Sequence, residues 1–329
     1  MAAPNLSVSC GYTGSAAPFT AVYTLAFLLG LGGTLTALWG FTCGRGPRRS
    51  MDVYLLNLLV SDVLLTLALP FRIATGLDAA PWGLRVFHCQ ASAVLVYINL
   101  YASIVFLALV SVDRYLQIAR SPRLRWAREA GLARVMSALT WALVLFLMVP
   151  NMAIPVRTLP ERRVLRCADL KQEAGLRWHK LATFIATAVF LNASVAVLAA
   201  NGLALRRLWA SRRLGDYGGG GRADGRPVAR RTARHIAVVT LAYVVCFVPY
   251  HAVRPPYTLS QGRPVANCRQ WSLYLAKECT LLLAVLHLCV NPFLYFHFSR
   301  SFRLRLTEAF RPKGKVSTPA QDLEPSPQP

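Results

Sequence analysis

Seven apolar stretches, each about as long as a bilayer is thick, run through this 329-residue sequence and leave few folds open to it. A helix rises about 1.5 Å per residue, so about 20 residues cross a hydrocarbon core of about 30 Å. Continuous Leu, Val and Ala runs lack the alternation of a membrane barrel, so helices must satisfy the backbone amides in lipid. The sequence therefore predicts an all-α membrane protein, a seven-transmembrane helix bundle. Its predicted spans are Pro18 to Cys43, Val53 to Phe71, Val86 to Val112, Val135 to Val156, Leu181 to Leu205, Ile236 to Val253 and Cys279 to Phe298.

Hydrophobic residues make up 55% of the chain and charged residues only 16%, which leaves a small water-exposed part. No segment between the spans is long enough for a separate soluble domain, so we expect one domain with short loops. The predicted division is an extracellular N-terminus (1–17), a transmembrane domain (18–298), an amphipathic cytoplasmic helix (299–310) and a disordered cytoplasmic tail (311–329). The N-terminus lacks the layout of a cleaved signal peptide, so the first span is expected to act as a signal anchor.

Basic residues are divided unequally between the two sides of the predicted bundle. Residues 44–52, 113–134, 206–235 and those from 299 onward carry 24 of the 37 Lys and Arg residues, which predicts that they are cytoplasmic. The N-terminus is then extracellular, in a multi-pass protein of the plasma membrane. The same bias accounts for the formal charge of +23, so we expect the lipid bilayer and no nucleic acid as a partner. The outer side still has 13 basic residues against five acidic ones, which favours an anionic ligand, surface glycans or an acidic peptide.

Four of the eight cysteines fall on the predicted outer side, where oxidising conditions favour disulfides. A bond between Cys89 and Cys167 would pin the loop between the fourth and fifth spans over the bundle. Cys10 would then pair with Cys268. Asn5 begins an Asn-Leu-Ser sequon on the same side and is the predicted glycosylation site. No Cys/His pair has the spacing of zinc ligands, so no metal centre of that kind is predicted.

Asp62 is the one residue among Asp, Glu, Lys and Arg that lies inside the predicted spans. Because a charge at bilayer depth costs at least a few kcal/mol, its presence suggests a function. We expect Asn99, Ser103, His287 and Asn291 to supply polar atoms around it. Such a cluster suits a sodium ion or a proton, and the alternative is a purely structural hydrogen-bond network.

The third span ends in Asp113-Arg114-Tyr115, at the predicted inner face. Arg114 is expected to be held by the neighbouring Asp113 and, once released, to point toward the cytoplasm; an ordinary snorkelling arginine is the alternative. Pro249 and Pro292 each remove a backbone hydrogen bond and permit a kink in the sixth and seventh spans. Together these motifs predict a conformational switch.

At these residues the chain resembles the rhodopsin family of G-protein-coupled receptors, over residues 18–310. The resemblance implies that an extracellular ligand shifts the bundle between two states and activates a heterotrimeric G protein, of the inhibitory class in most relatives, with arrestin as the other cytoplasmic partner to consider. A helix with Phe298, Phe302, Leu306 and Phe310 at four-residue steps is implied on the inner leaflet. The shared motifs are Asn57, Asp62, Cys89, Asp113-Arg114-Tyr115, Trp141, Cys246-Phe247-Val248-Pro249 and Asn291-Pro292-Phe293-Leu294-Tyr295, and the implied switch residues are Asp113, Arg114, Tyr115, Phe247, Pro249, Asn291, Pro292 and Tyr295.

Within the family, the outer half of the sixth span resembles the purinergic nucleotide receptors, in the branch of the platelet ADP receptor, the UDP-sugar receptor and several orphans. Residues 80–89 and 149–155 are most similar to an orphan member proposed as a neuropeptide receptor. The resemblance implies a nucleotide-like anionic ligand, with a peptide or a lysophospholipid as alternatives. The anion-binding positions of the branch match Arg254, Tyr257 and Lys277, with Arg85, Tyr97 and His251 nearby. Alternatively, Arg254 and Lys277 form ion pairs with Glu278 or loop carboxylates.

Three other functions fit the sequence less well. A transporter or channel would show paired broken helices or a repeated half, and a retinal-type pump needs a lysine that residues 279–298 lack. A hydrolase would need a Ser/His/Asp or metal constellation with workable spacing. We therefore expect no enzymatic activity. Two departures from the family, Gly33-Thr34 in place of its usual Asn and Asn201 near its usual Tyr, bear on activation more than on fold.

Overall fold

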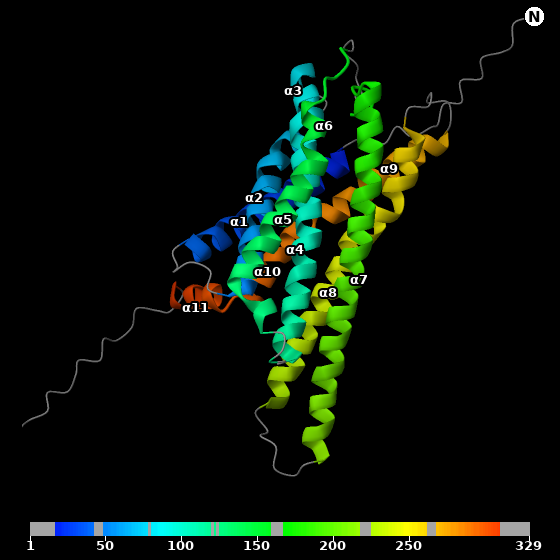
Figure 1. Ribbon diagram of the computed structural model, residues 1–329. Helices are drawn as coiled ribbons and strands as arrows, with labels where there is room; N and C mark the ends of the chain where they lie inside the picture. Colours follow the sequence, from blue (N-terminus) through cyan, green and yellow to red (C-terminus); the bar gives the residue numbers. More distant parts are fainter. Residues whose placement is uncertain are drawn as a thin grey trace, which may run out of the picture.

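Long apolar helices pack side by side in the computed structural model of the chain (Figure 1). The structure describes residues 17–42, 49–77, 80–119, 122, 125–158, 167–217, 225–261 and 268–309. Within these residues, seven helices are long and apolar enough to cross a bilayer. The predicted helical bundle is confirmed.

The spans follow the chain in order. The first three are α1 (Ala17–Thr42), α2 (Ser50–Gly76) and a continuous run of α3 (Trp82–Phe87), the π-helical turn η1 (His88–Ser92) and α4 (Ala93–Ala119). The next three are α5 (Ala130–Met148), which continues into the single turn α6 (Pro150–Ala153), α7 (Glu173–Tyr217) and α8 (Gly225–Ser260). The seventh is made of α9 (Cys268–Val285) and α10 (His287–Phe298). The 3₁₀ turn η3 (Trp126–Arg128) precedes α5, and α11 (Arg300–Ala309) follows the last span.

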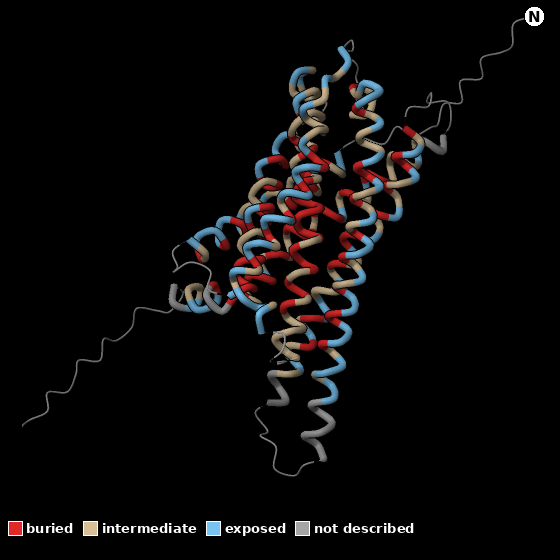
Figure 2. Tube along the Cα trace, in the orientation of Figure 1, coloured by how far each residue is buried: buried red, intermediate tan, exposed pale blue. Residues whose placement is uncertain are grey.

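The third span is the centre of the bundle. In its most apolar window 72% of the residues are buried, against 28% in α1, and Figure 2 shows buried residues concentrated along the middle of the molecule. The indole nitrogen of Trp141 on α5 donates a hydrogen bond to the Asn57 side-chain oxygen on α2, at 2.8 Å. Asn57 and Trp141, two of the motif positions named above, therefore join neighbouring helices.

Helix ends differ from the predicted spans for identifiable reasons. Helix α7 extends beyond both predicted ends of the fifth span, because charged residues are compatible with a helix once it leaves the lipid. The fourth span is interrupted at Pro150, which starts a separate turn. The seventh is interrupted near Leu286, where the imidazole of His287 donates to the Ala284 carbonyl oxygen at 2.5 Å and so takes a backbone acceptor from the helix.

Helix α1 packs closely against the last span because it presents glycine there. A Cβ atom at Gly33 would lie 2.3 Å from a ring carbon of Pro292, so only a residue without a side chain permits this approach. A Cβ atom at Gly40 would meet the ring of Phe302 on α11 in the same way, at 2.3 Å.

The helix predicted after the last span is confirmed, and α11 runs across the end of the bundle (Figure 1). Phe302 is buried and stacks on Phe41 of α1, with ring centroids 5.9 Å apart. Ser299 caps the helix: its hydroxyl accepts a hydrogen bond from the Phe302 amide and donates one to Asp52 at 2.8 Å. These contacts attach α11 to α1 and α2.

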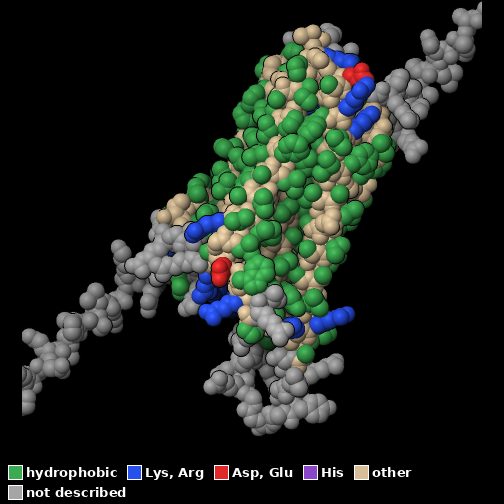
Figure 3. Space-filling model, viewed as in Figure 1, with side chains coloured by type: hydrophobic (Ala, Val, Ile, Leu, Met, Phe, Trp, Pro, Cys, Tyr) green, Lys and Arg blue, Asp and Glu red, His purple; other side chains and the backbone are tan. Residues whose placement is uncertain are grey.

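The surface pattern matches a protein that spans a bilayer. On the face in Figure 3, hydrophobic side chains cover the middle of the molecule, whereas Lys and Arg side chains lie toward its two ends. Apolar side chains therefore face the region that lipid would occupy.

The predicted disulfide between Cys89 and Cys167 is confirmed. It ties η1 to the segment before α7, where Val156 and Lys171 form an antiparallel bridge. We call this end of the bundle the outer end, following the predicted orientation, and the opposite end the inner end. Cys10 and Asn5 lie outside the described residues, so the second disulfide and the glycosylation site stay predictions.

Candidate ligand-binding site

A cavity of about 460 Å³ opens into the outer end of the bundle. Its walls come from η1 and every helix from α1 to α9, and the disulfide-tied segment with Cys167 and Lys171 closes part of it. Cavities of this size, with a few convergent polar groups, are typical of small-molecule sites.

Basic side chains reach this cavity from five different elements. Among the described residues that line it there is one carboxylate, that of Glu278 on α9. The cavity therefore has an excess of positive charge, in line with the surplus predicted for the outer side. The basic side chains are those of Arg72 (α2), Arg85 (α3), Lys171 (before α7), Arg254 (α8) and Lys277 (α9).

Arg254 is 95% buried, with a relative exposure of only 5%, and still has no carboxylate partner among the described residues. Its guanidinium donates to the Tyr97 hydroxyl at 3.4 Å and to Nε2 of His179 at 3.0 Å, and it lies 5.0 Å from the centre of the Tyr97 ring. Burying a charge is costly unless it is paired. A guanidinium held only by neutral groups is thus prepared for an anion that enters the cavity.

His179 links Arg254 to a second cation. Because its Nε2 accepts from Arg254, its Nδ1 carries the proton and donates to the Asn151 side-chain oxygen at 3.3 Å. The same oxygen accepts a hydrogen bond from the Lys171 ammonium at 3.0 Å. Burial, and secondly the charge of Arg254, lower the pKa of Lys171 to about 8. This amine therefore changes its charge close to physiological pH.

The opposite side of the cavity is neutralised in part by Glu278. Its carboxylate contacts both the Arg72 guanidinium and the Lys277 ammonium. The ammonium also lies 5.4 Å and 5.0 Å from the ring centres of Tyr257 and Tyr274. Of the two ion pairs considered from the sequence, the one between Lys277 and Glu278 is formed, whereas Arg254 has no such pair with any carboxylate of the described part of the chain.

Five of the six residues expected to bind ligand line this cavity: Arg85, Tyr97, Arg254, Tyr257 and Lys277. The sixth, His251, is buried outside the lining, where it makes an edge contact with Tyr101 of the cavity wall. Any role of His251 in binding stays a prediction.

Sequence reasoning missed several polar residues of the cavity, among them Arg72, Lys171 and His179. Arg72 directly follows the predicted end of the second span at Phe71, and a basic residue so close to lipid was an available signal. Lys171 and His179 gave no such signal, because only the folded loop and the contact with α8 bring them to the cavity.

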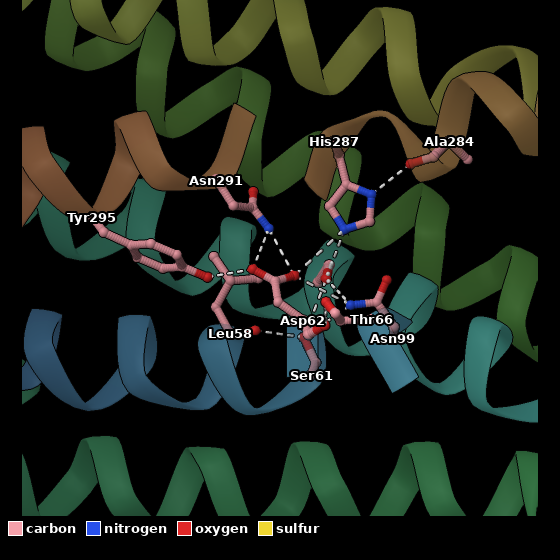
Figure 4. A network of polar contacts seen from close by, with 10 residues as sticks. Leu58, Ser61, Asp62, Thr66, Asn99, Ala284, His287, Asn291 and Tyr295 are labelled. Carbon is pink, nitrogen blue, oxygen red and sulfur yellow. Dashed lines mark hydrogen bonds and ion pairs between the residues drawn. The ribbon is translucent and has the colours of Figure 1, made fainter. Parts of the chain in front are cut away.

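Asp62 is at the centre of a network of polar contacts between helices of the bundle (Figure 4). Asp62 is 1% exposed, and its two oxygens accept hydrogen bonds from the Asn291 amide at 2.9 Å each, from the Tyr295 hydroxyl and from the Asn99 amide at 3.3 Å. N–H and O–H donors therefore satisfy the carboxylate, as in the structural alternative. A sodium ion would need the Tyr295 hydroxyl to move away first, so a cation here stays a prediction.

The other members of the cluster complete a network across three spans. Ser103 on α4 lies 3.2 Å from Nε2 of His287 on α10 and 3.3 Å from the Ser61 hydroxyl on α2. Asn99 also donates to Ser61 and Ser103 at 3.3 Å and 3.4 Å. The five residues predicted to gather here, Asp62, Asn99, Ser103, His287 and Asn291, do come together.

At the inner end the expected ion pair between Asp113 and Arg114 is absent, and that expectation was wrong. The Asp113 carboxylate instead accepts from the Ser50 hydroxyl and the Gln117 amide, both at 2.5 Å. The Arg114 guanidinium lies over the ring of Phe298 on α10, 4.7 Å from its centre. Two neutral donors thus satisfy Asp113, and the Arg114 guanidinium lies on an aromatic face.

The remaining switch residues are spread along the bundle. Tyr115 packs against Arg207 of α7, whose guanidinium lies 5.6 Å from its ring centre and donates to the Ala119 carbonyl at 3.1 Å. Phe247 is fully buried, and its ring lies 5.1 Å from that of His287. Pro249 and Pro292 both lie inside helices, as predicted.

Comparisons with known proteins agree with this geometry. Residues 33–295 match the model of the 7 transmembrane receptor (rhodopsin family). The chain is 45% identical over 319 residues to mouse G-protein coupled receptor 171, covering 97% of both chains. It is 33% identical over 290 residues to human purinoceptor 13 (88% of this chain, 80% of the relative) and 32% identical over 284 residues to bovine purinoceptor 14 (86% and 82%). With its seven spans, its disulfide and these relatives, the chain belongs to the rhodopsin family of seven-transmembrane receptors.

Proposed function

We propose that this receptor binds an extracellular, nucleotide-like anionic ligand in the outer cavity and activates a heterotrimeric G protein of the inhibitory class. The observation that carries the proposal is Arg254, buried in the cavity wall without a carboxylate partner among the described residues. Phosphate suits this site because guanidinium recognises it through two parallel hydrogen bonds. Two of the relatives are purinoceptors, which supports a nucleotide.

Charge balance supports a ligand with more than one negative charge. Arg254 and Lys171 contact no carboxylate among the described residues that line the cavity, whereas the Glu278 carboxylate offsets Arg72 and Lys277. A diphosphate would satisfy Arg254 and still reach a second cation such as Lys171. A neutral ligand would leave this charge uncompensated.

Activation requires that the ligand bind the active state more tightly than the inactive state, because equal affinity shifts no equilibrium. In the proposed mechanism α8 pivots near Pro249, and the inner ends of α4, α8 and α10 separate. Arg114 then leaves the ring of Phe298 and becomes accessible to the C-terminal helix of the G protein.

The test is nucleotide exchange on an inhibitory G protein in membranes that contain the full-length receptor. The panel is ADP, UDP, UDP-glucose, acidic peptides and lysophosphatidates, each with the wild type and with Arg254→Ala. A charge-assisted hydrogen bond contributes about 1.5–3 kcal/mol, so the substitution should weaken the active ligand roughly 10- to 100-fold. Arg177→Ala, at an exposed outer position on α7, is the control and should change the potency of the active ligand less than twofold. A response that Arg254→Ala leaves unchanged refutes the anion site, and a response to peptides alone assigns the receptor to the other ligand class.

A further inference from the structure

Three aromatic side chains form one wall of the cavity at the outer ends of α8 and α9. We call Tyr257, Trp271 and Tyr274 the aromatic wall; all three line the cavity. The rings of Trp271 and Tyr274 are 5.5 Å apart with an interplanar angle of 31°, and those of Tyr257 and Tyr274 are 6.2 Å apart. Such a surface favours a flat group that stacks on it.

Two polar atoms in the lining of this cavity have no hydrogen-bond partner among the described residues. They are Nε1 of Trp271, a donor, and Oε1 of Gln261, an acceptor, and both residues line the cavity. Gln261 is 93% buried, with a relative exposure of 7%. Buried polar atoms are nearly always satisfied, so an unpaired donor and an unpaired acceptor on one cavity wall require an explanation. A bound ligand would supply both partners.

The wall adjoins the proposed anion site. Tyr257 follows Arg254 by three residues on α8, so the two side chains share a helix face. Lys277 lies over the rings of Tyr257 and Tyr274 while its ammonium contacts Glu278. An anionic group held by Arg254 or Lys277 would therefore have the wall as its neighbour.

These observations restrict the uncharged part of the ligand. An alkyl chain would cover the rings but leave the Trp271 donor and the Gln261 acceptor unsatisfied in an apolar contact. A heteroaromatic ring that stacks on Tyr257 or Tyr274 and has its edge toward Trp271 and Gln261 can accept from the indole N–H and donate an N–H group to the Gln261 oxygen. A nucleobase has such an edge.

We propose that the aromatic wall together with Gln261 is a second subsite of the cavity and that it takes a flat heteroaromatic ring, of the nucleobase type, whose edge pairs an acceptor with an N–H donor. This subsite rests on the proposed function, because the ring is placed by an anionic group at Arg254. It separates nucleotides from lysophospholipids, which share a phosphate but have no such ring.

The experiment measures equilibrium binding to the purified full-length receptor in lipid nanodiscs. The probes are inorganic pyrophosphate, UDP, ADP and their base-methylated analogues N3-methyl-UDP and N6,N6-dimethyl-ADP, which lack the N–H donor. The variants are Trp271→Phe, which keeps a ring but removes the N–H, and Gln261→Leu. Trp209→Phe, at a position on α7 that is 60% exposed, is the matched control.

On the wild type we expect UDP or ADP to bind at least tenfold more tightly than pyrophosphate, and base methylation to remove most of that advantage. Trp271→Phe and Gln261→Leu should each reduce the advantage of the nucleotide over pyrophosphate to threefold or less. The affinity for pyrophosphate itself should stay within twofold of the wild-type value. The methylated probes need no substitution, so they test the subsite even if a variant fails to fold.

Two other results would overturn the subsite. Equal binding of methylated and unmethylated nucleotides, together with weaker pyrophosphate binding in Arg254→Ala, overturns this subsite and leaves the anion site standing. Failure of every probe to bind, or pyrophosphate binding that Arg254→Ala does not weaken, overturns the proposed function and the subsite with it.

Discussion

Substitution of Glu278 by Gln keeps the shape of the side chain and removes the one negative charge among the described residues that line the cavity. In the structure this carboxylate contacts both Arg72 and Lys277 and offsets their charge. Without it, both cations become available to an anionic ligand. We therefore expect Glu278→Gln to tighten anion binding, although it breaks two ion pairs.

Two opposing effects set the magnitude. Two unit charges about 8 Å apart interact by about 2 kcal/mol at an effective dielectric constant of about 20, so removing the repulsion tightens binding roughly 30-fold. Breaking a buried ion pair costs about 3–5 kcal/mol of stability. The lower end applies here, because the Arg72 side chain keeps 25% of its surface exposed. Affinity should rise while the melting temperature falls.

The assay measures both quantities on the purified full-length receptor in nanodiscs. Binding of UDP and of pyrophosphate gives the change in affinity, and thermal unfolding without ligand gives the change in stability. Glu173→Gln is the matched control, because this exposed residue of the outer end pairs only with Arg177 in the next turn. Weaker binding in Glu278→Gln, comparable to that of Arg254→Ala, would refute the reasoning and mean that Glu278 positions the cations instead of opposing the ligand.

Three further outcomes are expected. The charged fraction of Lys171 falls as pH rises through its pKa of about 8, so ADP, whose base does not titrate in this range, should bind more weakly at pH 9 than at pH 7.5, and Lys171→Arg should remove the difference. Gly33→Ala places a Cβ atom 2.3 Å from a proline ring on α10 and should lower stability by about 1–3 kcal/mol in thermal unfolding, whereas Gly32→Ala meets nothing within 4 Å and should not. Phe298→Leu removes the ring under Arg114, a contact of about 0.5–2 kcal/mol, and should raise ligand-free nucleotide exchange roughly 2- to 30-fold; unchanged basal exchange would contradict that role.

The spans and the motifs were predictable because their signals are local. Apolar length alone determines which segments cross lipid, and it identified all seven helices. Helix ends were less predictable, since α7 continues into charged sequence and the break before α10 depends on the His287 side chain. The length and hydropathy of a segment contain no information about the extension of α7 or the break before α10.

The candidate site was predictable only where a residue type and a family position coincide, as for Arg254 and Lys277. Lys171 reaches the cavity because a disulfide and a β-bridge fold its loop over the bundle. The contact of Arg114 with Phe298 depends on how α4 and α10 pack. The sequence suggested Asp113 as the partner of Arg114 because the two are adjacent, but adjacent residues on a helix point in different directions.

The cavity and the Asp62 network are joined by packed side chains, which offers a physical route between ligand and switch. Tyr101 of the cavity wall contacts His251, the imidazole of His251 donates to the Phe247 carbonyl at 2.9 Å, and the Phe247 ring packs on His287. His287 in turn lies 3.2 Å from Ser103 of the network. Spatial continuity alone does not establish coupling, which also requires an element with two discrete arrangements. The break between α9 and α10 is the best candidate for that element, because His287 bonds the backbone of one helix and the polar network of the bundle at once.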